Sequence, residues 1–135
     1  MIFPGLADLS EWGLLALRLA VGAIFIVHGW PKITGGRGMA AAMGGGQARP
    51  VLVGMITVQG IVEVGGGVLL ILGVLTQLVA LAFMIIMVGA IVLKNTQWRT
   101  GFMSQQTTGW EFDLVLLAAN LVLFLTGAGS IAIQT

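Results

Sequence analysis

Residues 61–81 read IVEVGGGVLLILGVLTQLVAL and contain the end of one apolar run and the start of another. The two runs meet within the six residues LGVLTQ, a hinge too short for anything but a tight antiparallel turn between helices. The same stretch carries Glu63, an acidic residue inside an apolar run, just before three consecutive glycines. The stretch therefore predicts two neighbouring helices, with an ionisable group buried in the first of them.

The composition of the whole chain is that of a membrane protein. Its 135 residues are 58% hydrophobic and only 8% charged, with a mean hydropathy of +1.05. A chain this short cannot bury so much apolar surface in a water-facing core, because small domains leave much of their surface exposed. We therefore expect an integral membrane protein surrounded by the lipid bilayer.

The apolar runs predict one domain, residues 1–135, folded as an all-α, four-helix membrane bundle. The four runs are close to the roughly 20 residues that cross a bilayer, and they cover residues 11–30, 51–74, 76–94 and 110–127. The glycine-rich connection 35–50 has room for one short interfacial helix at AAAM, and residues 97–109 form a polar loop. No internal repeat is evident, which does not favour an inverted-repeat transporter.

Basic residues predict the orientation of these spans. They fall in the two long connections and hardly elsewhere outside a span, at Lys32, Arg37, Arg49, Lys94 and Arg99. By the positive-inside rule these connections are cytoplasmic, so both termini are expected outside the cytoplasm, in a cell inner membrane.

Charge and cysteine content exclude several classes of function. The net charge of +1 does not indicate a nucleic-acid partner. The chain has no cysteine, which excludes disulfides, thiolate metal sites and iron–sulfur clusters. We expect no metal and no intrinsic cofactor, so any redox chemistry would need a cofactor supplied from elsewhere.

Ionisable residues inside the spans need a physical reason, because each costs on the order of 3 kcal/mol in hydrocarbon. Arg18 lies in the first span and Glu63 in the second. Counting about 1.5 Å per residue from the inner ends of the spans places both at the same depth, with Asn120 close to it. Gln59 lies one turn from Glu63 on the same helix face. Asp113 lies two turns from Asn120 on the same face of the fourth span, and together these residues predict a polar seam toward the cytoplasm. The seam contains either a buried Arg18–Glu63 ion pair that fixes packing or a binding site.

His28 is the only histidine, and it lies beside a stripe of the first span that contains Arg18 and Lys32. We expect it near the inner mouth of the seam. It is either an interfacial imidazole bonded to a carbonyl or headgroup, or an acid–base or ligand-binding group. Gly66 and Gly67 give a smooth surface that suits either helix packing or the approach of a flat ring.

Three segments together resemble the DoxX family of small four-helix membrane proteins. They are LRLAVGAIFIVHGWPKI at 17–33, IVEVGGGVLLILGVLTQLVAL at 61–81 and LTGAGS at 125–130. The resemblance implies that Arg18, His28, Lys32 and Glu63 are signature positions and that Gly22, Gly29, Gly66 and Gly73 are packing positions. It also implies relatives that are subunits of quinone oxidoreductases or parts of oxidative-stress complexes.

Three functions are compatible with these features. The first is a redox-associated membrane subunit, not an enzyme by itself, whose seam of Arg18, His28, Lys32, Gln59, Glu63 and Asn120 receives a quinone headgroup. The quinone tail would lie along the glycine surface, and a redox partner would supply the electrons. The second is an assembly subunit of a larger membrane complex, and the third is a small transporter component. We assign no catalytic residue.

Overall fold

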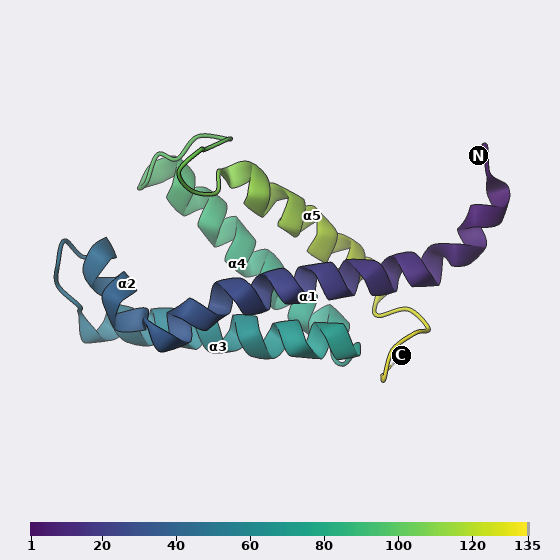
Figure 1. The fold of residues 1–135 in the computed structure, drawn as a ribbon, viewed down its shortest axis with the longest axis horizontal. Coiled ribbons are helices and arrows are strands. Elements are labelled where there is room, and N and C mark those ends of the chain that lie inside the picture. Colours follow the sequence, from purple (N-terminus) through teal and green to yellow (C-terminus); the bar gives the residue numbers. More distant parts are fainter. Residues whose placement is uncertain (135) are drawn as a thin grey trace.

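The computed structural model describes residues 1–134, and within that range every regular element is helical. A short 3-10 helix, η1, precedes five α-helices (Figure 1), with bounds η1 Pro4–Leu9, α1 Ser10–Thr34, α2 Gly36–Met43, α3 Pro50–Leu72, α4 Thr76–Thr96 and α5 Trp110–Thr126. The predicted all-α membrane class is confirmed. The four predicted runs correspond to α1, α3, α4 and α5, and α2 occupies the glycine-rich connection.

Within residues 1–134, three segments are long and apolar enough to cross a membrane: Pro4–Thr34, Pro50–Leu72 and Thr76–Thr96. Helix α5 has 17 residues, fewer than these three. Many large apolar side chains lie on the outside of the helices, and Val27, Ile85 and Leu125 are each about two-thirds exposed, at 67%, 66% and 70%. Such a surface requires lipid around it, because exposing this much apolar area to water is energetically unfavourable.

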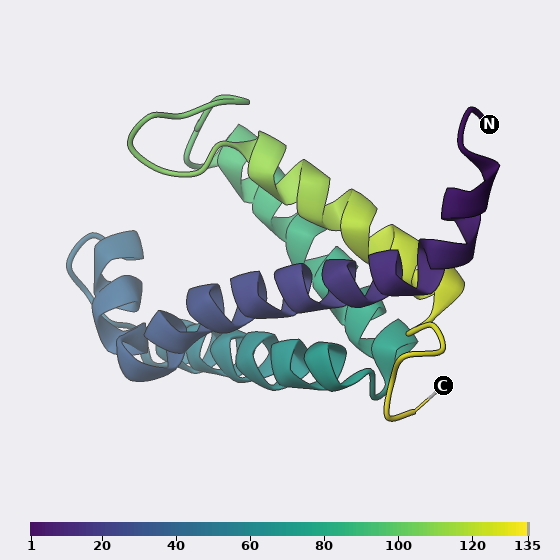
Figure 2. The same cartoon turned by 45° about the vertical axis from the view of Figure 1, so that its right-hand side comes forward.

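The helices pack as two antiparallel pairs. Helix α1 lies along α3, and α4 lies along α5; the two pairs diverge toward the end of the molecule that carries α2 and the loop 97–109 (Figures 1 and 2). The short turn between α3 and α4 thus joins two different pairs. Helices α3 and α4, although joined by this turn, are therefore not each other's closest partners along their lengths.

Glycines allow α1 and α3 to approach closely at two places. A Cβ on Gly22 would lie 2.7 Å from the carbonyl oxygen of Gly67, and one on Gly67 would lie 2.6 Å from that of Gly22. Gly29 and Gly60 make the same reciprocal contact, at 2.9 and 2.8 Å. Small residues bring helix backbones together in lipid, where packing replaces the hydrophobic effect as the driving force. These two contacts fix the register of the α1–α3 pair.

The two pairs meet around Phe83 of α4. Its ring stacks on Phe25 of α1 at a centroid distance of 3.7 Å, and it covers Gly66 of α3, where a Cβ would lie 2.8 Å from the ring. Phe83, Leu70 and Leu123 are fully buried and centre the core. The α3–α4 turn begins at Gly73, whose φ of +73° is the left-handed conformation that commonly ends a helix.

The C-terminal segment 127–134 returns to the start of the bundle. Its backbone donates from Ile133 to the carbonyl of Leu72 and from Gln134 to that of Gly73. Ser130 donates its N–H to the carboxylate of Glu11 on α1. This segment, which we call the C-terminal strap, therefore connects α1, the end of α3 and the end of α5.

Candidate functional site

The principal buried ionisable site is centred on Glu63 of α3, whose exposed fraction is 2%. Lys32 of α1 places its Nζ atom 2.7 Å from Oε1 of Glu63, and the Gln59 amide donates to the same oxygen at 3.1 Å. A carboxylate inside a membrane span is stable only when paired in this way. We call Lys32, Gln59 and Glu63 the Glu63 cluster.

Local sequence explains why the Glu63 cluster forms. Gly29 of α1 lies directly against Glu63, so that a Cβ on Gly29 would be 2.7 Å from that of Glu63. The missing side chain admits the carboxylate between the helices. Lys32 follows three residues later on the same face of α1, and its flexible stem reaches Glu63 while the residue stays partly exposed.

Oε2 of Glu63 has no hydrogen-bond partner among the residues that the structure describes. A buried oxygen without a donor costs about 1 to 3 kcal/mol, more when it is charged. Such an atom is an available acceptor for a ligand or a proton. The Glu63 cluster thus has an unused hydrogen-bonding position.

The predicted Arg18–Glu63 pair is wrong. The Arg18 guanidinium donates instead to two carbonyls of the C-terminal strap, Ala128 at 2.8 Å and Ile131 at 2.7 Å. Arg18 also lies against Gly73 at the end of α3, whereas Glu63 lies against Gly29. The eleven residues between Arg18 and Gly29 put the two charges about 16 Å apart along α1.

The physical reason is the register of α1 and α3. The prediction placed Trp30 and Val51 at one level, as the inner ends of the two spans. Helix α1 in fact continues through Pro31 to Thr34. The connection through α2 then allows α3 to begin at Pro50, beyond the C-terminal end of α1 along the axis of the pair. The glycine contacts shift α3 by about two turns relative to the predicted level.

His28 lies on α1 but does not join the Glu63 cluster. Its Nδ1 atom is 2.9 Å from the carbonyl oxygen of Ile24, and its ring lies 5.2 Å from that of Phe112 on α5. The side chain is exposed. The local bond fits the interfacial role, and the contact with Phe112 makes His28 a link between the two helix pairs.

Asn120 is likewise separate from the Glu63 cluster. The residue is fully buried in α5, its amide donates to the carbonyl of Leu116 at 2.8 Å, and its Oδ1 atom has no partner within residues 1–134. The predicted seam of Arg18, Glu63 and Asn120 is therefore three separate polar positions.

A second buried ion pair was missed. Lys94 at the end of α4 lies 2.6 Å from Oδ2 of Asp113 near the start of α5, and it also donates to Thr108. From the sequence, Lys94 was expected only as a basic residue of the connection between the third and fourth spans. The signal was available, because the adjoining ends of an antiparallel helix pair lie at the same depth.

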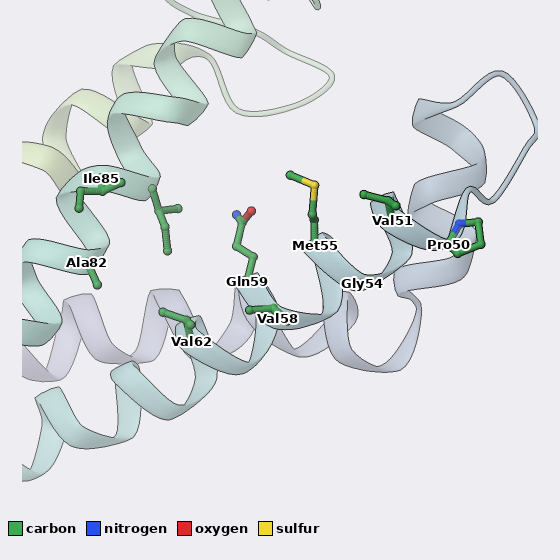
Figure 3. Close-up of a pocket in the computed structure, with 10 residues that line it drawn as sticks. Pro50, Val51, Gly54, Met55, Val58, Gln59, Val62, Ala82 and Ile85 are labelled. Carbon is green, nitrogen blue, oxygen red and sulfur yellow. The ribbon is translucent and has the colours of Figure 1, made fainter.

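Gln59 alone of the cluster lines a groove of about 620 Å³ between α3 and α4 (Figure 3). Gln59 is its one polar wall residue, and the other nine are apolar, glycine or proline: Pro50, Val51, Gly54, Met55, Val58, Val62, Ala82, Ile85 and Ile86. In contrast, the glycine surface expected to hold a quinone tail is closed, because Gly66 is covered by Phe83 and Gly67 by Gly22 and Ile26.

The fold and these polar positions define a small, all-helical integral membrane protein with ion pairs buried between its helices. The DoxX family model matches residues 13–96, and the chain belongs to that family. It is 32% identical to "Putative oxidoreductase CatD" of Bacillus subtilis (strain 168) over 92% of this chain and 86% of that protein. It is also 32% identical to "Inner membrane protein YphA" of Escherichia coli (strain K12), over 90% of this chain and 87% of that protein. No solved structure matches.

Proposed function

We propose that this protein is the membrane subunit of a quinone-linked redox complex and that the Glu63 cluster receives the quinone headgroup. The observation that carries the proposal is a buried carboxylate with one unused oxygen, hydrogen-bonded to Gln59, which lines an apolar groove open on its outer side. The oxidoreductase in the name of the Bacillus subtilis relative supports a redox role. The electrons come from a partner protein.

The residue types suit a quinone. Its carbonyl oxygens accept hydrogen bonds, which the Lys32 ammonium and the Gln59 amide can donate. Its reduction consumes protons, and Glu63 is placed to pass them on. Lys32 is partly exposed and so connects the buried carboxylate with the membrane edge. Arg18, which the strap already binds, has no part in this role.

The same proposal includes the topology. We take α5 as a fourth span, because its 17 residues are at the lower limit of the roughly 17 to 25 that cross a bilayer. The loops with Arg37, Arg49 and Arg99 then face the cytoplasm and both termini face outward.

Quinone binding by purified protein tests the proposal. We expect wild-type protein in detergent to retain a quinone. Glu63→Gln should weaken retention at least tenfold, because it replaces the carboxylate that binds Lys32 and Gln59 and that exchanges protons with the quinone. Asp8→Asn, at the exposed η1 helix, is the matched control and should bind as wild type does. Absence of quinone binding to folded wild-type protein would refute the proposal.

The alternative is an assembly subunit. The observation in its favour is that both buried ion pairs join neighbouring helices, Lys32–Glu63 between α1 and α3 and Lys94–Asp113 between α4 and α5. Native mass spectrometry after gentle extraction separates the two functions. A redox partner together with a bound quinone supports the first, and incorporation into a large complex without quinone supports the second.

A further inference from the structure

The groove between α3 and α4 follows from how these helices separate. Both leave the turn after Gly73 and touch where Gly66 meets Val79 and Phe83. Beyond that contact they diverge (Figure 2), and the facing side chains leave a groove between them. A Cβ added at Gly54 has no atom within 4 Å. The groove thus results from the divergence of α3 and α4, and no described segment of the chain covers it.

The groove has the dimensions and the chemistry of a site for an apolar chain. On α3 it runs from Pro50 to Val62, about 18 Å at 1.5 Å per residue. Val51, Met55 and Val58 are largely exposed, so the groove is open to lipid along its length. A charged group has no partner on these walls, and desolvating it there would be costly.

Gln59 gives the groove a direction. Its side chain projects from α3 between the helices (Figure 3), and its amide is bonded to Glu63. The groove therefore has one uncharged hydrogen-bonding group at a fixed depth, about 14 Å from the start of α3. An occupant that contacts both the apolar walls and Gln59 needs a long apolar chain and an uncharged polar head.

We propose that this groove holds the isoprenoid tail of the quinone, which enters sideways from the bilayer with its head at Gln59 and Glu63. The inference rests on the proposed function and specifies its ligand as a long-tailed quinone. A phospholipid fits less well, because its charged head would stay near Arg49 at the start of α3 and its acyl chain has no polar atom to contact Gln59.

A groove-filling substitution tests the tail position. Gly54→Leu places a side chain in the groove without a steric conflict, and Gly65→Leu is the matched control, since Gly65 lies on the same helix with no atom within 4 Å of its added Cβ. Each variant is titrated in detergent with a tail-less benzoquinone, with the same head bearing a multi-isoprenoid tail, and with an acyl phospholipid. Bound molecules are counted by native mass spectrometry.

We expect Gly54→Leu to weaken binding of the tailed quinone at least tenfold, to leave the tail-less quinone within twofold, and Gly65→Leu to change neither. Equal binding of the tailed quinone to wild type and Gly54→Leu would overturn the tail position while leaving the headgroup site intact. If wild type binds neither quinone, the proposed function fails as well. Loss of phospholipid alone in Gly54→Leu would make the groove a lipid site and contradict the inference.

Discussion

At the scale of single residues, the chain gives each of three buried charges a partner, which comes from the same helix pair for Glu63 and Asp113 and from the C-terminal strap for Arg18. Glu63 has Lys32, Asp113 has Lys94, and Arg18 has backbone carbonyls. Buried pairs are weak sources of net stability, but removing one member leaves an uncompensated charge. Replacing one member of a buried pair should therefore lower the stability of the protein much more than replacing both members with apolar residues.

We expect Lys32→Met to destabilise the protein by about 3 kcal/mol, because Glu63 then stays buried with only the Gln59 amide. The double variant Lys32→Met/Glu63→Leu should recover most of that loss, since it removes both charges and keeps the volume. Unfolding by a denaturing detergent, followed by helical circular dichroism, measures both. Additive losses in the double variant would show that the two residues do not act as a pair.

At the scale of helices, close packing of α1 on α3 depends on glycines seven residues apart on each helix, at 22 and 29 and at 60 and 67. Each glycine faces the backbone of its counterpart. A side chain at one of these positions must push the helices apart, and the displaced contacts include the one that admits Glu63.

We expect Gly22→Leu to destabilise the protein by about 1 to 3 kcal/mol, the usual cost of overpacking, because its Cβ meets the Gly67 carbonyl. Gly13→Leu on the same helix has no atom within 4 Å of the new Cβ and is the matched control. That control should be neutral or slightly stabilising, since leucine favours helix by somewhat under 1 kcal/mol over glycine. Thermal unfolding of both variants measures the difference, and equal midpoints would contradict the proposed role of the glycine contact.

The helices were predictable from sequence and their relative positions were not. Runs of apolar residues located α1, α3, α4 and α5 to within four residues at either end, because a helix surrounded by lipid needs a continuous run of apolar residues. Register depends instead on which glycines meet across a pair, and several registers put glycine opposite glycine. The predicted level of Arg18 and Glu63 failed for this reason. The Gln59–Glu63 contact was foreseeable, because it lies within one helix turn.

At the scale of the whole molecule, two helix pairs joined near Phe83 diverge on the side where α2 and the loop 97–109 lie (Figure 2). Cationic side chains gather in the connections on that side, at Arg37, Arg49 and Arg99. If α5 crosses the bilayer, the opposite side holds both termini and the strap.

Cysteine labelling tests this topology cleanly, because the natural chain has no cysteine. We expect Gln47→Cys and Gln105→Cys to react with a membrane-impermeant maleimide only after the cytoplasmic side is opened. Ile2→Cys and Ser130→Cys should react in intact cells. Labelling of Ser130→Cys on the same side as Gln105→Cys would show that α5 does not span.

The bond between Arg18 and the strap has a consequence for biosynthesis. Helix α1 precedes the other α-helices in the chain, and the acceptors of Arg18 at Ala128 and Ile131 lie 110 and 113 residues later. Throughout translation the inserted first helix therefore carries a guanidinium without its final acceptors. The bundle therefore gains this contact only after the strap has left the ribosome, when all five α-helices have already been synthesised.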